Sequence, residues 1–260
     1  MIPTNGTFLD FDGFYEEIKR ALDTREPYMF TRYGDGEGLI LGYPGDTSQD
    51  NFEKRINKWF SIGAMGPHEQ RAFGEMMRES VKAADMIGIP GLRHAEVNFN
   101  WRSVHIYLNK YKLVRDDHLV CSMDNVLELQ KRKLYPELFK GHDAVAAITC
   151  RDIEQLCRDK LGFKHVDVFH TPPQLRPCVG PRMTDTRHYP ELYNQIPEWI
   201  HSVNPAGKLF LIGAGGLGKV YSMWIKEAGG IAFDIGSVLD GWVGAVTRSH
   251  ISYDPDMWRL

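Results

Sequence analysis

The sequence predicts an α/β protein with a mostly parallel sheet of about seven strands and helices on both faces. Two observations predict this fold class. Short apolar runs recur along the 260 residues, and segments with apolar residues at helical spacing separate them. Such runs are typical of strands that are buried on both faces and joined by helical crossovers. Because no linker, low-complexity tract or repeat divides the chain, we expect a single domain over residues 1–260.

The first half of the chain contains three predicted strands. It opens with an amphipathic helix, because Phe11, Phe14, Ile18 and Leu22 recur at helical spacing. The apolar runs that indicate strands are YMFTRYG (28–34), DMIGIPG (85–91) and HLVCS (118–122). The proline and glycine at the end of the second run stop that strand. Further helices are expected at 50–60, 68–83 and 98–108.

The second half continues the same alternation with four more strands. The strand-like runs are DAVAAIT (143–149), HVDVFH (165–170), KLFLIGA (208–214) and GIAFDIG (230–236). The helices expected here are 123–133, 151–162 and 217–228. Strands that alternate with helices in this way indicate crossover units and hence parallel pairing.

One long segment interrupts the alternation. Residues 171–190 contain five prolines and three arginines without any periodicity. Such long structureless segments are unusual in compact domains and are often binding loops. The other interpretation is a surface loop without a role in binding. The segment follows the end of a strand, where ligands of open α/β sheets bind. His170, at that strand end, is therefore a candidate substrate-binding residue or a structural histidine.

Composition excludes several classes of protein. The formal net charge is -3, so no basic excess favours binding to nucleic acid. No run of 18 apolar residues predicts a transmembrane helix, and the N-terminus does not have the pattern of a signal peptide. The four cysteines, which show no close spacing, indicate reduced thiols in a cytoplasmic protein: Cys121, Cys150, Cys157 and Cys178.

A pair of acidic residues follows the first predicted strand. Asp35 and Glu37 are separated only by Gly36, and Gly34 precedes them. Residues two apart in an extended segment point to the same face, so both carboxylates are expected to project together. Carboxylate pairs of this kind suit Mg²⁺ or Mn²⁺ with a diphosphate, and Arg32 would contact the phosphate or hold the pair in place. The same residues also suit a polar turn.

Three segments resemble one family of enzymes. RYGDGE after YMFT is similar to the Asp-x-Glu segment of the GT-D class of glycosyltransferases, whose typical form is Arg-(Phe/Tyr)-Gly-Asp-Gly-Glu. Residues 211–242 resemble the C-terminal segment of that family, and IGIPG (87–91) resembles a third element. The resemblance implies a Rossmann-like, GT-D-like fold. It also implies that Asp35 and Glu37 form the metal and diphosphate site for a nucleotide-sugar donor such as a UDP-sugar.

The chain departs from the family pattern at two places. Ser237 stands where the family usually has a histidine after Asp-Ile-Gly. The glycine-containing loop of the family is commonly Gly-Pro-Thr-Ala, whereas this chain has Gly213-Ala214-Gly215-Gly216. The acidic motif is intact.

The glycine loop supports a second hypothesis. Gly213, Gly215 and Gly218 follow a strand and open a helix, and Asp234 ends the next strand, as in a dinucleotide-binding fingerprint. This pattern suggests an enzyme that depends on NAD(P) or S-adenosylmethionine. The fingerprint normally stands at the start of a mononucleotide-binding unit, with several strands after it. Here only one strand follows, which argues against this hypothesis. Gly213, Gly215, Gly216 and Lys219 remain candidate phosphate-binding residues at a helix N-terminus, or the glycines serve only close packing.

The favoured hypothesis is a metal-dependent glycosyltransferase of the hexosyltransferase type. Asp35 and Glu37 would bind Mn²⁺ or Mg²⁺, which stabilises the departing diphosphate. Asp234 or Asp240 would remove the proton from the hydroxyl group of the acceptor. The acceptor would be a glycan, a glycoconjugate or a protein, and the pattern leaves the sugar and the oligomeric state open. Ser237 replaces the usual histidine of the family, and this suggests a third hypothesis, in which the protein binds a nucleotide sugar but does not catalyse transfer.

Overall fold

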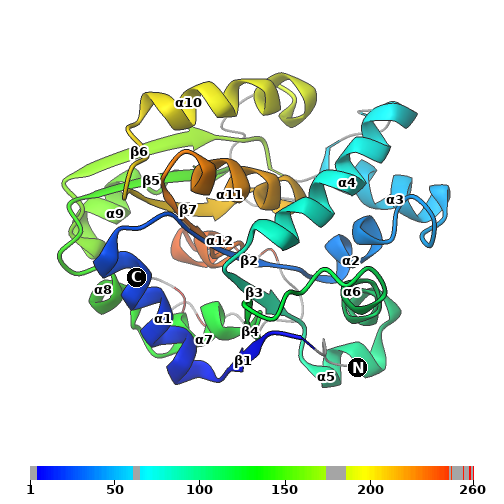
Figure 1. Ribbon diagram of the computed structural model, residues 1–260. Helices are drawn as coiled ribbons and strands as arrows, with labels where there is room; N and C mark the ends of the chain where they lie inside the picture. The colour runs from blue at the N-terminus through cyan, green and yellow to red at the C-terminus, as the bar shows by residue number, and fades with distance from the viewer. Residues whose placement is uncertain are drawn as a thin grey trace.

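The structure is a computed structural model that describes residues 5–60, 65–173 and 186–245, together with residues 247, 254, 258 and 260. Eight strands in these residues form one sheet, and all neighbouring strands are parallel (Figure 1). The strands are β1 (Thr7–Leu9), β2 (Tyr28–Arg32), β3 (Met86–Ile89), β4 (Leu119–Ser122), β5 (Ala144–Thr149), β6 (His165–His170), β7 (Leu209–Gly213) and β8 (Ile231–Asp234). The predicted α/β class is confirmed, with eight strands rather than about seven.

Helices connect the strands and cover the sheet. They are α1 (Phe11–Thr24), α2 (Asp35–Leu41), α3 (Gln49–Trp59), α4 (Pro67–Ala83), α5 (Leu92–Val97), α6 (Phe99–Lys110), α7 (Asn125–Lys131), α8 (Tyr135–Leu138), α9 (Glu154–Leu161), α10 (Ile196–Ser202), α11 (Gly218–Glu227) and α12 (Val238–Trp242). Three short helical turns are η1 (His188–Leu192), η2 (Tyr193–Gln195) and η3 (Gly215–Leu217). Within the described ranges, no helix is long and apolar enough to cross a membrane.

The strand that the sequence did not predict is β1. It has only three residues and pairs with β4 at one edge of the sheet, where Phe8 lies opposite Val120. The side chain of Phe8 is 56% exposed. Because β1 lacks the buried apolar run by which the other strands were recognised, only its pairing with β4 identifies it as a strand.

The order of the strands creates a switch point at the centre of the sheet. The order is β1-β4-β3-β2-β8-β7-β5-β6. From β2 the chain moves outward through β3 to β4, whereas β5 to β8 fill the other half. The neighbouring strands β2 and β8 therefore connect to opposite halves of the sheet. Ligands of open α/β sheets bind at the carboxyl ends of strands at such a point.

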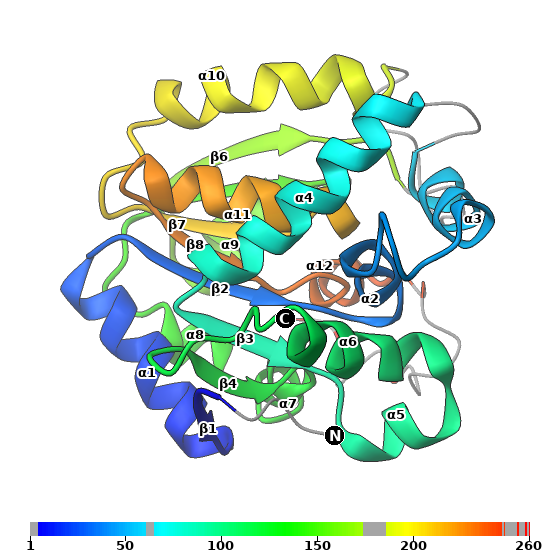
Figure 2. The same ribbon diagram turned by 45° about the vertical axis from the view of Figure 1, so that its right-hand side comes forward.

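Two hydrophobic clusters pack on the two faces of the sheet. Neighbouring residues on one strand belong to different clusters, as Met29 and Phe30 of β2 do, because successive side chains point to opposite faces. One cluster contains residues from α3, α4, α6, α10 and α11, and the other contains residues from α1, α7, α8, α9 and α12. Figure 2 shows α4, α10 and α11 together on one side of the sheet and α1 on the other. Both faces are covered, as predicted.

The proline-rich segment at 171–190 lies partly outside the described residues. The structure describes its first residues and the turn η1 near its end, whereas residues 174–185, which include Cys178, are outside the description. The expectation of a binding loop at 174–185 therefore stays a prediction.

Candidate functional site

The acidic pair lies in the first turn of a helix. The sequence predicted an extended segment here, and that prediction is wrong, because α2 begins at Asp35 directly after Gly34. Glu37 is the third helical residue, and its Oε2 accepts a hydrogen bond of 3.0 Å from the Gly34 backbone N–H. An acid at this position that reaches back to the preceding residue is half of a capping box. A Glu three residues after Gly34 and just before an apolar run was the signal for this helix start.

The helical conformation sends the two carboxylates in different directions. Residues two apart on a helix do not face each other. Oδ2 of Asp35 lies 3.3 Å from Nη2 of Arg55 on α3, and Oε1 of Glu37 lies 3.6 Å from Nζ of Lys219 on α11. The Asp35 side chain is 39% exposed, whereas that of Glu37 is 12% exposed. Each acid of the motif therefore has a separate cationic partner.

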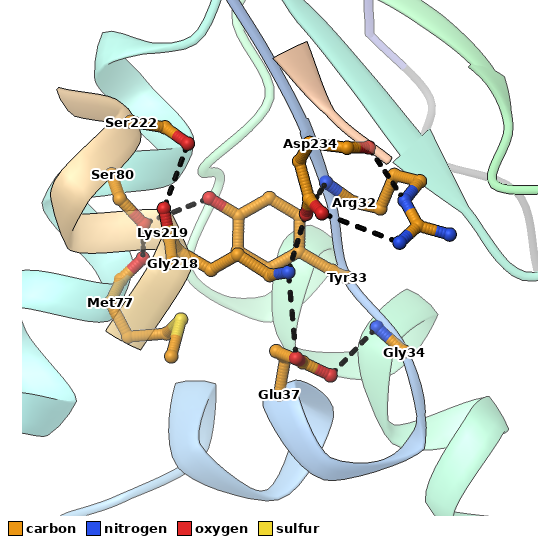
Figure 3. A network of polar contacts seen from close by, with 10 residues as sticks. All are labelled: Arg32, Tyr33, Gly34, Glu37, Met77, Ser80, Gly218, Lys219, Ser222 and Asp234. Atoms are coloured by element: carbon orange, nitrogen blue, oxygen red, sulfur yellow. Dashed lines mark hydrogen bonds and ion pairs between the residues drawn. The ribbon is translucent and has the colours of Figure 1, made fainter. Parts of the chain in front are cut away.

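Lys219 joins the motif to the end of β8, as Figure 3 shows. Its ammonium group lies between two carboxylates and donates a hydrogen bond of 2.6 Å to Oδ2 of Asp234. Arg32 at the end of β2 binds the same aspartate, since its backbone N–H donates to Oδ2 at 3.2 Å and its Nη2 donates to Oδ1 at 3.3 Å. The candidate residues Arg32, Glu37, Lys219 and Asp234 thus form one network at the switch point between β2 and β8.

The network fixes the ionisation state of Asp234. Burial raises the pKa of its carboxyl group, but the charges of Lys219 and Arg32, together with their hydrogen bonds, outweigh burial and hold the pKa below its ordinary value. Asp234 is therefore a carboxylate with two cationic partners in the interior of the protein. Its side chain is only 4% exposed.

Trp59 packs against one glycine of the acidic motif and one glycine that follows β7. An ideal Cβ on Gly36, in the acidic motif, would lie 2.4 Å from the Trp59 ring, and one on Gly216 would lie 2.2 Å from it. Only glycine fits at either position while the ring stays in place. The Trp59 ring also lies 6.0 Å from the guanidinium carbon of Arg55. Arg55 and Trp59 carry no signal in the sequence that links them to the motif, because both lie about 20 residues beyond it, on a separate helix.

Side chains and backbone of the protein pack against the glycines of the loop after β7. An ideal Cβ on Gly213 would lie 2.8 Å from Leu239 and 3.2 Å from the carbonyl oxygen of Gly236. Gly215 has a positive φ of +59°, where glycine is favoured. Gly216 faces Trp59, and Lys219 points to the acids. The fingerprint glycines are thus accounted for by close packing and by the start of α11.

Asp240 and His170 pair with side chains outside this network. Asp240 on α12 pairs with Nε of Arg151 at 2.7 Å and accepts a hydrogen bond of 2.5 Å from Thr247. His170 ends β6, which is four strands from β2 in the sheet, and its Nε2 lies 3.1 Å from Oε1 of Glu154. At about 4.8 Å per strand, β6 and β2 are roughly 19 Å apart. The structure therefore does not bring His170 to the acidic motif.

The charged network contains ligands that suit a hard divalent cation. Asp35 presents an accessible carboxylate, whereas both oxygens of Glu37 face other groups, Gly34 and Lys219. Across the described part of the chain, no group of three or more histidine, cysteine or acidic side chains could hold a metal ion. Mg²⁺ is usually bound by one or two carboxylates, with phosphates and waters as further ligands. Asp35 is thus the accessible carboxylate of the motif, and a cation bound there would bring most of its ligands with it.

A family model and solved structures are similar to this chain. The family model, described as a GT-D fold-like domain, matches residues 9–242. No curated protein matches. One similar structure is a selenomethionine-substituted domain of unknown function 1792, which is 15% identical with a TM-score of 0.55 over 88% of this chain and 78% of that chain. Another structure of this domain, described as having a distinct glycosyltransferase fold, is 14% identical with a TM-score of 0.53 over the same shares, 88% and 78%.

A third structure covers more of both chains. It is described as a new glycosyltransferase of the same domain type from Streptococcus sanguinis. It is 17% identical, with a TM-score of 0.55 over 97% of this chain and 91% of that chain. At such identities the likeness shows a shared fold.

Proposed function

This chain belongs to the GT-D-like family, and we propose that it is a metal-dependent glycosyltransferase with a nucleotide-diphosphate sugar as donor. The match to the family model confirms the resemblance found in the sequence. The family and its structural neighbours support a glycosyltransferase. The proposed donor is a UDP-sugar, and the proposed acceptor is a hydroxyl group of a glycan, a glycoconjugate or a protein. We also propose a cytoplasmic location.

The observation that carries the proposal is the charged network at the switch point. Three cationic side chains and three carboxylates meet at the carboxyl ends of β2 and β8: Arg32, Arg55 and Lys219 with Asp35, Glu37 and Asp234. A diphosphate leaving group carries negative charge that increases as the sugar–phosphate bond breaks. Cationic groups around that position stabilise this charge.

The residues of the network have different proposed roles. Asp35 and Glu37 would hold Mn²⁺ or Mg²⁺, which when bound supplies further positive charge to the diphosphate. Lys219 and Arg55 would turn from the carboxylates toward the phosphate oxygens as the donor enters. Arg32 and Asp234 stay together, because their contacts are buried and include the backbone of both residues.

The proton of the acceptor hydroxyl group needs a base. Of the two aspartates that the sequence offered, we favour Asp240. Asp234 is 4% exposed and is bound by two cations, whereas the side chain of Asp240 is 19% exposed and is bound by one cation, Arg151. In the proposed reaction the acceptor oxygen bonds to the anomeric carbon, the bond to the diphosphate breaks, and the proton passes to Asp240.

The alternative of an NAD(P)- or S-adenosylmethionine-dependent enzyme has less support. A ribose-binding acid at the end of the strand after the glycine loop must have a carboxylate available for hydroxyl groups. The carboxylate at that place, Asp234, is already bound to Lys219 and Arg32. A nucleotide-sugar-binding module without catalysis uses the same network and differs only in its lack of turnover.

One thermal unfolding experiment tests the donor assignment. The protein is heated with UDP, GDP, CMP, NAD or S-adenosylmethionine, each with and without Mn²⁺. A ligand at 100 times its dissociation constant adds about 2.7 kcal/mol to the free energy of unfolding. We expect a Mn²⁺-dependent increase in Tm with UDP. An increase with NAD or S-adenosylmethionine that needs no metal would support the alternative enzyme, and UDP binding without turnover of any UDP-sugar would support the binding module.

A further inference from the structure

The segment formed by α5 and α6 concentrates exposed apolar side chains. Six large hydrophobic side chains are exposed in the described part of the chain, and four of them lie between residues 92 and 106: Leu92, Val97, Phe99 and Ile106. Val97 is the most exposed of the six, at 84%. Single exposed apolar residues are normal on a protein surface, whereas a group of them in one place indicates an interaction site.

These side chains lie on two helices that pack against each other, and we call the following exposed residues the α5–α6 face: Leu92, Arg93, Val97, Phe99, Arg102 and Ile106. On α6, the spacing of Phe99, Arg102 and Ile106 places all three on one side of the helix. The opposite side of α6 is buried. On α5, Arg93 and Val97 are one turn apart. The rings of His94 on α5 and Trp101 on α6 are 5.5 Å apart, which holds the two helices together.

The charges on this face are mostly positive. Arg93 and Arg102 are exposed, and neither forms an ion pair with a carboxylate among the residues that the structure describes. The guanidinium group of Arg102 instead lies 5.8 Å from the Phe99 ring. Glu96 is the one acid between residues 92 and 106. Exposed apolar groups interspersed with cations fit a surface that offers both anionic headgroups and an apolar interior.

We propose that the α5–α6 face binds the surface of an anionic membrane. Leu92, Val97, Phe99 and Ile106 enter the boundary between headgroups and acyl chains, and Arg93 and Arg102 contact lipid phosphates. The surplus of positive charge, two arginines against Glu96, favours an anionic partner over a second copy of the chain, which would carry the same surplus.

The α5–α6 face lies beside the charged network. Figures 1 and 2 show α6 next to α2 at one end of the sheet, with α5 on the far side of α6. An ideal Cβ on Gly34 would lie 3.6 Å from the ring of Trp101, so α6 contacts the loop that starts the acidic motif. If the proposed function holds, membrane binding brings the donor site to acceptors held at that surface. The binding itself needs neither donor nor acceptor.

Vesicle co-sedimentation of the full chain tests the proposal. Vesicles of pure phosphatidylcholine are compared with vesicles that contain about 30% phosphatidylglycerol, at roughly 0.1 M salt, where exposed charges still interact. We expect binding to the anionic vesicles only. The Arg93→Glu/Arg102→Glu variant should weaken binding by at least about fivefold for each arginine. The Val97→Asp/Phe99→Asp variant should weaken it about tenfold or more.

Controls separate the face from a general loss of structure. Phe8 is 56% exposed on β1, at the sheet edge, so Phe8→Asp should bind vesicles as the unchanged chain does. Circular dichroism and Tm must be the same for all variants compared. The Asp35→Asn variant should bind vesicles fully, which keeps this test independent of the proposed function.

Three results would overturn the proposal. One is equal binding to neutral and anionic vesicles. Another is binding that survives in both double variants. The last is a dimer in sedimentation velocity that the Val97→Asp/Phe99→Asp variant abolishes, without any vesicle binding, since the face would then join two copies of the chain.

Discussion

Lys219 and Asp234 form an ion pair of 2.6 Å in the interior, with side chains that are 6% and 4% exposed. Removal of one partner of a buried pair leaves an uncompensated charge and costs about 3–5 kcal/mol. Lys219→Met should therefore lower the free energy of unfolding by about 3 kcal/mol in urea titrations. The double variant Lys219→Met/Asp234→Asn should recover part of that loss.

An exposed pair of the same length provides the control. Lys19 and Asp23 are also 2.6 Å apart, but their side chains are 49% and 58% exposed. Lys19→Met should change stability little, because water screens exposed pairs. Equal losses for Lys219→Met and Lys19→Met would contradict the conclusion that burial makes the Lys219–Asp234 pair important.

The acidic motif should be needed for transfer but not for folding. Asp35→Asn and Glu37→Gln should each lower kcat/KM with a UDP-sugar by at least about 100-fold, because each removes a charge from the site of the leaving group. Glutamine at 37 can still accept the hydrogen bond from Gly34 that starts α2, so Tm should stay close to that of the unchanged chain. Asp23→Asn is the matched control on the surface. Full activity in both motif variants would contradict the proposed site.

Metal and nucleotide should bind cooperatively. The three carboxylates of the network are already neutralised by three cations, so a divalent ion alone must compete with Lys219 and Arg55. A metal–diphosphate complex brings its own negative charge. Isothermal titration calorimetry should show that UDP tightens Mn²⁺ binding about tenfold or more. Lys219→Met should bind Mn²⁺ alone more tightly than the unchanged chain does, and identical Mn²⁺ affinities with and without UDP would argue against this coupling.

The contact between Gly216 and Trp59 should limit substitution. Gly216→Ala places a methyl group against the indole ring, and we expect a loss of about 1–3 kcal/mol, as in other overpacked cores. The double variant Gly216→Ala/Trp59→Leu should be more stable than Gly216→Ala, since the smaller side chain leaves room. Gly91→Ala is the control, because its Cβ would meet only His94, at 3.9 Å. A neutral Gly216→Ala variant would show that Trp59 does not hold this position in solution.

His188 should make stability depend on pH. Burial lowers the pKa of His188 to about 3 from 6.5, and its Nε2 lies 2.9 Å from the hydroxyl group of Tyr221. Between these values the unfolded chain binds the proton and the folded chain does not, so stability falls as pH decreases below 6.5. The loss from this group should be about 2 kcal/mol between pH 7.5 and pH 5.

Urea titrations at several pH values measure this effect. In His188→Gln the dependence over that range should become shallower, because glutamine has no proton to bind. An unchanged dependence would assign the effect to other groups.

Much of the fold could be read from local patterns. Seven strands were predicted because each is a short apolar run, whereas β1, with three partly exposed residues, gave no such signal. The acidic motif was found because its residues are adjacent in the chain. The conformation of the motif was predicted wrongly as extended. That prediction overlooked that Glu37 can act as the acid of a capping box and so start a helix.

By itself, the sequence determined the α/β class, the strand ends that carry polar residues and the acidic motif, because each depends on neighbouring residues. Only the tertiary structure decided which distant side chains complete the site. Arg32 and Asp234 are 202 positions apart and meet because β2 and β8 pair in parallel, which brings their carboxyl ends together. The contacts of Arg55, Trp59 and Lys219 depend on how α3 and α11 pack across that edge, and no local pattern encodes such packing.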